Sequence, residues 1–424
     1  MPMRIFHVNT FFSAGGTARV VGGISEELRR GGYDCMIAAA RGTEPSGRRT
    51  LRVGSRLSVC FNAAVARIAD NDGFMAHCAT RRLVDAIERY SPDVVHLHNL
   101  HGYYVNVELL FDYLRRSGKR VVWTLHDCWA MTGHCPYFST ASCEEWLSGC
   151  RSCVLMHEYP KCFFGGRSAE NFRLKKSLFT GIDNLTLVVP SRWLASIVSR
   201  SYLSDYPLRI IPNGVDTMRF RPVESDFRSR YGIGSRTMLL SVASSWVGRK
   251  GFGGLAELAK MLDDSYVIVV IGITEAQRRL LPEGIVALPA IGSDELLAQA
   301  YSAADLLVNL STEESFGLVT LEALACGTPV VVYDATACPE PLMPVFEPLA
   351  DGHHAKPFCS AEAAIDCGVV VDMRRGVAGV AEMVSSGAWR TISKEACRRH
   401  ALGFDAHEVY SRYIALYDEL NKEG

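Results

Sequence analysis

Short apolar runs alternate with amphipathic stretches along most of the chain, a pattern typical of strands followed by helices. Arg4–Val8 (RIFHV) predicts a buried strand, and a glycine-containing loop leads from it to an amphipathic helix over Thr17–Arg30. Regular alternation of this kind favours parallel sheets with helices on both faces. Further strands are predicted at Cys35–Ala39, Val94–Leu97, Arg120–Thr124 and Leu185–Val189, and further helices at Tyr104–Arg116 and Arg192–Ser199.

A second series of strands begins after Ile211–Asp216 (IPNGVD), a turn-rich segment that cannot lie inside a strand. We therefore expect an α/β protein of two Rossmann-like domains, residues 1–212 and 213–404, with a cleft between them. The remaining stretch, residues 405–424, contains an amphipathic pattern and is expected to pack back on the first domain as a helix. The strands predicted in the second domain are Met238–Ala243, Tyr266–Ile271, Ile285–Leu288, Asp305–Leu310 and Pro329–Tyr333.

Composition and charge exclude several classes of protein. Hydrophobic residues make up 48% and charged residues 21% of the 424 residues, so disordered, collagen-like and coiled-coil proteins are excluded. The net charge of −1 provides no global field for nucleic acid, and we expect no nucleic-acid partner. The apolar runs fall short of the ~20 residues that span a bilayer. Because the N-terminus (MPMRIFHVN) also lacks the pattern of a signal peptide, we expect a cytoplasmic protein.

Residues 127–165 interrupt the first series and are rich in cysteine, glycine and aromatic residues. At ~40 residues this stretch is longer than ordinary connections, and loops of that length are usually functional or separately stapled. Six of the 14 cysteines lie here. Four of them could form a tetrahedral structural zinc site, with reduced packed thiols or disulfides as the alternatives. These are Cys135, Cys143, Cys150 and Cys153, of which only the last two have the two-residue spacing of a zinc knuckle.

Residues 311–323 carry the clearest chemical signal. They follow a predicted strand and open a helix, so Glu314 falls at the carboxyl end of a parallel strand, where open α/β sheets bind ligands. The free N–H groups of residues 317–319 would form an anion site at the helix N-terminus. Glu322 lies about one turn further on, where the helix dipole keeps its carboxylate ionised. Since a carboxylate can accept two hydrogen bonds from a vicinal diol, the segment is typical of a nucleotide-sugar site.

By spacing alone, Glu314 and Glu322 could equally be ordinary exposed acids at the start of a helix. However, Glu-(seven residues)-Glu with Phe-Gly-Leu inside resembles the signature of the retaining glycosyltransferases of family 4, which have the GT-B fold. The resemblance implies that this segment binds the donor. The donor-binding residues implied are Ser315, Phe316, Gly317, Leu318 and Val319, together with the two glutamates.

Other motifs resemble the same family in the same order along the chain. Gly15-Gly16 follows the first strand and resembles the glycine loop where donor phosphates and acceptor meet. Ser245–Gly251 (SWVGRKG) resembles the phosphate-binding stretch, but serine stands where the family commonly has an arginine. We therefore assign neutralisation of the leaving diphosphate to Arg249 and Lys250 together, with exposed loop basics as the alternative.

Two further positions are implied by the resemblance. Trp123–Asp127 (WTLHD) ends a strand, and the family's histidine at the position of His126 faces the donor sugar. Asn213 belongs to a motif that resembles the family's interdomain turn, with some contact to the donor. His96, His98 and His101 either line the acceptor side of the cleft or satisfy hydrogen bonds in the core.

The cysteine segment is similar to that of bacterial exopolysaccharide, colanic-acid-type glycosyltransferases. Membership would imply transfer of a hexosyl unit from a UDP- or GDP-sugar to a saccharide acceptor with retention, without a dedicated base or a cofactor for catalysis. Such acceptors are typically lipid-linked at the inner membrane face. Residues 55–90 mix arginine with apolar residues and could contact a membrane peripherally, or form an ordinary soluble surface. Within them, residues 55–80 are expected to be an irregular insertion.

Two other functions share parts of this pattern. Nucleotide-sugar 2-epimerases also have two Rossmann-like halves, and their product would be an epimer or a released monosaccharide instead of a glycoside. A non-catalytic protein that binds sugar nucleotides or zinc would have no turnover to lose on mutation. A dinucleotide dehydrogenase is excluded, because the first loop lacks the spaced three-glycine fingerprint.

Overall fold

The computed structural model describes residues 2–13, 15–345 and 363–422. These residues form two compact units. Among the described residues, the first unit contains the chain up to Ile211 and the residues from Tyr410 onward, and the second contains Pro212 to Val409. Within the described part of the chain, no helix is long and apolar enough to cross a membrane.

The first unit is built on a seven-stranded parallel sheet with the order β3-β2-β1-β4-β5-β6-β7. Its central strands are buried on both faces, which is why they stand out in the sequence as continuous apolar runs. The strands are β1 Arg4–Phe11, β2 Asp34–Arg41, β3 Arg49–Arg52, β4 Val94–Leu97, β5 Arg120–Thr124, β6 Leu185–Val189 and β7 Leu208–Ile210.

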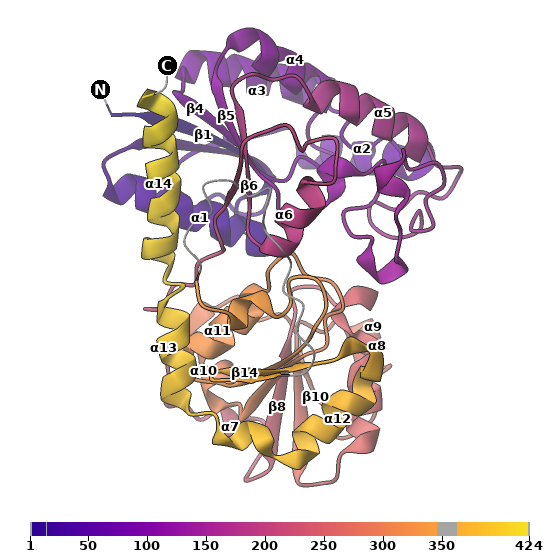
Figure 1. The fold of residues 1–424 in the computed structure, drawn as a ribbon, viewed down its shortest axis with the longest axis vertical. Helices are drawn as coiled ribbons and strands as arrows, with labels where there is room; N and C mark the ends of the chain where they lie inside the picture. Colours follow the sequence, from indigo (N-terminus) through magenta and orange to yellow (C-terminus); the bar gives the residue numbers. More distant parts are fainter. Residues whose placement is uncertain (1, 14, 346–362, 423–424) are drawn as a thin grey trace. The chain divides into compact units, whose positions relative to one another are not determined.

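Helices cover both faces of this sheet, with α1 and α14 on one side and α3 and α4 on the other (Figure 1). On α14, the hydroxyls of Tyr417 and Tyr413 lie 2.6 Å from His96 Nδ1 and 3.3 Å from Thr124 Oγ1, which fixes this helix to the sheet. The helices are α1 Gly15–Arg30, α2 Arg56–Ala69, α3 His77–Tyr90, α4 Val107–Ser117, α5 Ser168–Phe179, α6 Arg192–Val198 and α14 Ala406–Lys422.

The second unit has a sheet of the same size with the order β10-β9-β8-β11-β12-β14-β13, in which only the edge strand β13 runs antiparallel. The two Rossmann-like domains expected from the strand–helix alternation are therefore confirmed. The strands are β8 Thr237–Val242, β9 Tyr266–Ile271, β10 Val286–Leu288, β11 Leu306–Asn309, β12 Val330–Tyr333, β13 Ala363–Ile365 and β14 Gly368–Val371.

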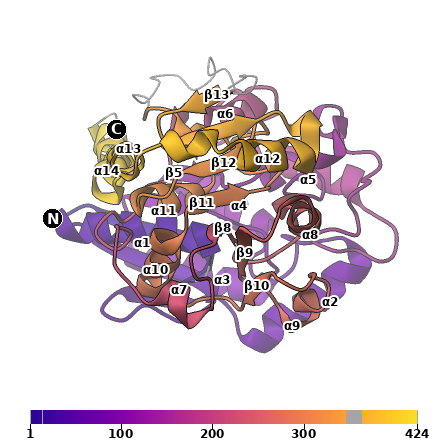
Figure 2. The ribbon, with the colours of Figure 1, turned by 90° about the horizontal axis from the view of Figure 1, so that it is seen from below.

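Helices again cover both faces of the second sheet: α10, α11 and α13 lie on one side, and α8 and α12 lie on the other (Figure 2). A continuous apolar core fills the space between these layers. The helices are α7 Phe227–Arg230, α8 Phe252–Met261, α9 Glu275–Arg278, α10 Asp294–Ala303, α11 Leu318–Ala325, α12 Gly376–Ser386 and α13 Lys394–Leu402.

The expectation of an irregular insertion at residues 55–80 is wrong, because α2 and the start of α3 occupy most of it. Ser55 caps α2 by accepting a hydrogen bond from the backbone of Ser58, whose side chain returns the bond. The buried stripe of this helix consists of Val59, Asn62 and two alanines, whereas the larger Leu57 and Phe61 on its other face are exposed. The most apolar residues therefore point to solvent, which hides the helical period.

Residues 127–165, in contrast, contain no α-helix or strand, and all of them are described. Three short 3-10 turns are their only regular structure: η1 Trp129–Met131, η2 Ser139–Ala141 and η3 Glu145–Leu147. The segment lies between β5, which ends at Thr124, and α5, which begins at Ser168.

Candidate active site

One group of site residues gathers at the carboxyl ends of β8 and β11. Glu314 lies on the loop between β11 and α11, and Lys250 ends the 3-10 turn η4 Gly248–Lys250, which follows β8. Their side chains form an ion pair. Burial by itself raises the pKa of Glu314, which is only 7% exposed, but the charges of Lys250 and Arg249 outweigh it and hold that pKa below its usual value. Glu314 is therefore ionised at neutral pH.

Backbone contacts lock the basic loop against the Glu314 loop. The Thr312 N–H donates to the Arg249 carbonyl over 2.9 Å, and Arg249 Nη1 donates to the Glu313 carbonyl over 2.9 Å. Gly251 permits this approach: its φ is +75°, and a Cβ there would lie 2.4 Å from Leu310 Cβ. The two positive side chains are thus held in position by the fold itself, as electrostatic preorganisation requires.

The N-terminus of α11 lies beside the same lysine. Gly317, with φ +108°, directly precedes the helix, and its carbonyl accepts the Thr320 N–H over 3.1 Å. The N–H groups of residues 317–319 therefore lie ahead of the first helical hydrogen bond. Lys250 and Val319 line one small cavity at the ends of β8 and β11. A cation next to a helix N-terminus is an arrangement that binds anionic groups such as phosphate.

Two of the residues expected to contact the sugar donor have buried side chains. Glu322 on α11 is 3% exposed, and its Oε2 accepts a hydrogen bond from the Tyr301 hydroxyl over 2.8 Å. Phe316 is 1% exposed and its ring lies 6.1 Å from that of Phe404, so any donor contact from Phe316 would come from its backbone. Because Glu314 and Glu322 are both buried, the alternative of ordinary exposed acids is wrong. Of the others, Ser245 is exposed, Ser315, Gly317, Leu318 and Val319 are half-buried, and Asn213 is buried.

Thr336 supports the site, although no sequence motif indicates it. Its hydroxyl accepts the Glu314 N–H over 2.9 Å and donates to the Glu314 carbonyl over 3.1 Å. Thr336 has φ +50°, which is uncommon for any residue other than glycine. It follows Glu314 by 22 positions, on the loop after the next strand, so no local motif links the two.

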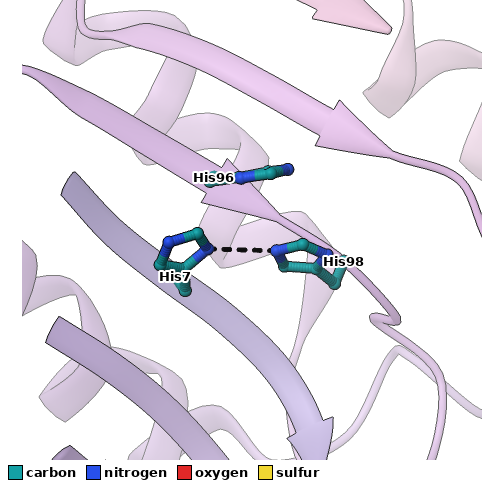
Figure 3. A group of neighbouring side chains, drawn as sticks. All are labelled: His7, His96 and His98. Carbon is teal, nitrogen blue, oxygen red and sulfur yellow. Dashed lines mark hydrogen bonds between the residues drawn. The ribbon is translucent and has the colours of Figure 1, made fainter. Parts of the chain in front are cut away.

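In the first unit, histidines form a chain of hydrogen bonds that runs from the middle of β1 to the carboxyl ends of β4 and β5. His7 Nδ1 lies 3.1 Å from His98 Nε2 (Figure 3), and His98 Nδ1 lies 3.0 Å from His126 Nε2. His96 lies beside His98 with ring centroids 4.0 Å apart, and both nitrogens of His96 bond to hydroxyls. His7 was not singled out in the sequence, although β1 and β4 pair in the register that places it opposite His96.

Burial keeps these histidines neutral. It lowers the pKa of His7 to about 3 and that of His126 to about 4, and it holds the pKa values of His96 and His98 well below the ordinary value. A neutral imidazole has one donor and one acceptor nitrogen. His7 Nε2 is buried without a partner, and an unused lone pair is more easily accommodated there than an unpaired N–H. His7 Nδ1–H therefore donates to His98 Nε2, and His98 Nδ1–H donates to His126 Nε2. His126 consequently carries its proton on Nδ1.

His7, His96 and His98 form the one potential metal-binding group found among the described residues, with one nitrogen of each within 4.8 Å of the others. Both nitrogens of His96 and of His98 are already hydrogen-bonded, and no carboxylate or thiol belongs to the group. The structure therefore favours core hydrogen bonding, one of the two alternatives for His96 and His98.

His101 and Asp127 form a second buried pair beside this chain, with His101 Nε2 2.8 Å from Asp127 Oδ2. Asp127 Oδ1 accepts the Trp129 N–H over 2.9 Å, and His101 Nδ1 lies 2.9 Å from the Tyr159 hydroxyl. Burial opposes both charges, yet their mutual attraction raises the pKa of His101 and lowers that of Asp127. This pair orients the chain immediately after His126.

The remaining predicted residues belong to the first unit. Gly15 and Gly16 are exposed and open α1 at the end of β1, in the same unit as His126. The four cysteines of the predicted zinc site line one small cavity in residues 127–165. No three of their sulfurs lie within 4.8 Å of one another, so the zinc site stays a prediction.

Comparison with known proteins identifies the activity. Residues 14–219 match the model of Glycosyltransferase Family 4, and residues 224–366 match that of Glycosyl transferases group 1. The chain is a glycosyltransferase. This agrees with the resemblance of the Glu314 segment, and the non-catalytic alternative is set aside.

Curated relatives of this glycosyltransferase differ in their named substrates. The WcaC protein of Escherichia coli K12, named as a colanic acid biosynthesis glycosyl transferase, is 26% identical over 68% of this chain and 70% of its own. A D-inositol 3-phosphate glycosyltransferase of Pseudarthrobacter chlorophenolicus is 34% identical over 47% of this chain, and the alignment spans about half (51%) of that relative. These matches support glycosyl transfer in general and do not select a donor, acceptor or pathway.

Solved structures share the GT-B fold of this glycosyltransferase. Sucrose-phosphate synthase from Thermosynechococcus elongatus has a TM-score of 0.71 at 16% identity, with both chains covered completely. Alr3699/HepE of Anabaena, solved in complex with UDP and glucose, has a TM-score of 0.66 at 14% identity, covering 98% of this chain and 100% of that one. At such identities the likeness shows the fold alone.

Proposed function

We propose that this glycosyltransferase moves a hexosyl unit from a UDP- or GDP-sugar to a hydroxyl of a saccharide acceptor, with retention at the anomeric carbon. The observation that carries the proposal is the Lys250–Glu314 ion pair beside the N-terminus of α11. It is supported by the UDP-glucose complex of HepE and by a Mycolicibacterium smegmatis relative named as GDP-mannose-dependent, which is 29% identical over 50% of this chain.

In this proposal the second unit binds the donor diphosphate. Arg249 and Lys250 neutralise the negative charge that grows on the leaving group as the glycosidic bond breaks, and the N–H groups of residues 317–319 donate to its oxygens. Ionised Glu314 holds Lys250 and accepts hydrogen bonds from donor hydroxyls. The acceptor attacks from the face of the leaving group, and a donor phosphate oxygen takes its proton, so no side-chain base is needed.

Donor binding is tested by thermal unfolding with UDP-glucose, GDP-mannose and ADP-glucose. A donor that binds the folded state is expected to stabilise it by about 2.7 kcal/mol at a hundredfold excess over its dissociation constant. Glu314→Gln should remove most of this shift, whereas Glu275→Gln, which alters an exposed glutamate of α9 in the same unit, should retain it. If none of the three nucleotide sugars stabilises the protein, the proposal fails.

Product analysis separates transfer from the epimerase alternative. Incubation with the stabilising donor and a saccharide acceptor should yield a glycoside whose anomeric configuration, read by proton NMR, matches that of the donor. An epimerised sugar released without an acceptor would contradict the proposal and support a nucleotide-sugar 2-epimerase. Inversion at the anomeric carbon would also contradict it.

We further propose a lipid-linked acceptor for cell-surface polysaccharide, reached at the cytoplasmic face of the membrane. The name of WcaC supports the pathway. An exposed apolar surface on α2 supports the membrane contact: Leu57 is 83%, Phe61 64% and Ile68 60% exposed. Phe163, 57% exposed, extends this surface, since its N–H donates to a carbonyl of α2 over 2.8 Å.

Vesicle sedimentation tests this contact. The wild type should bind vesicles containing anionic lipid, and Leu57→Ser combined with Phe61→Ser should weaken binding by about tenfold or more, because each apolar side chain contributes roughly 1.5 kcal/mol or more when buried. Leu280→Ser, at a residue 71% exposed in the second unit, serves as the control and should leave binding unchanged. Equal binding by all variants would mean that α2 is an ordinary soluble surface.

A further inference from the structure

Residues 127–165 are ordered without a regular scaffold. They contain three short 3-10 turns and no helix or strand, yet several of their side chains are fully buried. Trp146 stacks on Phe138 with ring centroids 5.1 Å apart, and both rings are about 4% exposed. A segment of this length without helix or strand often depends on a metal or on disulfides. The described cysteines form no disulfide, so a metal is the candidate that could hold this segment.

One small cavity inside the segment brings together its metal-binding side chains. It is lined by Cys135, Cys143, Cys150 and Cys153, and also by His134. The remaining two cysteines of the segment, Cys128 and Cys162, do not line this cavity.

A backbone N–H group already points at one of these sulfurs. The Gly133 N–H donates to Cys150 Sγ over 3.2 Å. Gly133 has no room for a side chain, because a Cβ there would lie 1.9 Å from the Ser168 carbonyl oxygen. N–H donors to sulfur stabilise a thiolate more than a neutral thiol, as they do around metal-bound cysteines.

His134 supplies an independent indication that a partner is missing from the cavity. Its Nδ1 bonds to Asp70 Oδ1 over 2.5 Å, which orients the ring. Its Nε2 is buried and has no hydrogen-bond partner, although His134 is only 2% exposed. An imidazole whose Nδ1 donates to a carboxylate carries its lone pair on Nε2, and a cation within the cavity would be a partner for that lone pair. A metal ion would be such a cation.

We propose that Cys135, Cys143, Cys150 and Cys153 bind one Zn²⁺ as four thiolate ligands. Sulfur ligands in a closed tetrahedral set select zinc in a structural role. No three of the sulfurs lie within 4.8 Å of one another, so the side chains rotate toward the shared cavity when the metal binds. The metal holds the segment that begins at Asp127, and thereby the His101–Asp127 pair next to His126.

Metal analysis of the full-length protein, purified without chelators, tests the proposal. One zinc per chain is expected, released in full when an organomercurial titrates the thiols. Cys150→Ser and Cys153→Ser should each lose the zinc. Cys162→Ser is the matched control: this thiol lies in the same segment and is fully buried, but it bonds to carbonyl oxygens, so its replacement should leave the zinc in place.

Replacement of zinc by Co²⁺ in the wild type avoids dependence on how the variants fold. The proposal expects thiolate-to-cobalt charge-transfer bands and the intense visible bands of a tetrahedral site. Zinc-free protein with four reactive thiols, or a disulfide among these cysteines, would overturn it. The ligand set would also be wrong if His134→Ala lost the zinc while Cys143→Ser kept it. Because these readouts are independent of glycosyl transfer, they are separate from the outcome of the proposed function.

Discussion

Replacing Lys250 by methionine is expected to lower kcat by about 10²- to 10³-fold, because it removes a positive charge aimed at the leaving diphosphate. The loss corresponds to roughly 3–4 kcal/mol of transition-state stabilisation. Lys250 is held for this role by its ion pair with Glu314 and by the backbone contacts of the neighbouring Arg249. Steady-state kinetics with the donor that stabilises the protein would measure the effect. Since the charge on the diphosphate grows during the reaction, kcat should fall more than donor affinity.

Lys260→Met provides the matched control, because it removes the same positive charge from the same unit. Lys260 is exposed on α8. Its kcat should stay within about twofold of the wild type. The combination of Lys250→Met with Glu314→Gln should cost less than the two single losses added together, because each residue acts partly through the other. If Lys250→Met were as active as the control, the leaving group would be stabilised elsewhere, and the role assigned to this pair would be wrong.

The fold could be predicted closely where a strand is buried on both faces. Val94–Leu97 and Tyr266–Ile271 are strands with the predicted bounds, because their apolar runs end at polar or turn residues. β3 was missed because Arg49–Arg52 is a short edge strand with two arginines, so it has no apolar run. Similarly, α2 was missed because its exposed face is more apolar than its buried one.

The site could be predicted only where its residues are close together in the sequence. The Glu314 loop and the N-terminus of α11 lie within one strand–loop–helix unit, so the sequence shows them together. Thr336 and Tyr301, which hold Glu314 and Glu322, come from other elements and carry no motif. The sequence also could not show that Glu322 is buried, because burial depends on how α11 packs against α10.

Stability of the first unit is expected to fall steeply as the pH drops from about 6.5 toward 4.5. His7, His96, His98 and His126 are neutral when folded, with the pKa of His7 lowered to about 3 and that of His126 to about 4. Unfolding returns each to an ordinary pKa near 6.5, so the unfolded chain takes up protons that the folded chain excludes. A group with a depressed folded pKa therefore stabilises the fold fully above its unfolded pKa, and this stability is lost as the pH falls.

His101 acts in the opposite direction, because its pKa is raised in the folded state and it stabilises the fold at lower pH. That contribution is complete by pH 6.5, below which His101 is protonated in both states and adds no slope. The loss within this window is therefore that of about four histidines, or roughly 5 kcal/mol for one pH unit. Urea unfolding at several pH values would measure it, with hydrogen exchange of β1 and β4 peptides assigning the transition to the first unit. His7→Leu should reduce the slope of the unfolding free energy against pH by about one proton, because it removes one histidine that stays unprotonated in the folded state. The substitution removes only one hydrogen bond. A first unit whose stability did not change between pH 6.5 and 4.5 would show that these rings are protonated in the folded state, and would contradict the direction of proton donation inferred for His126.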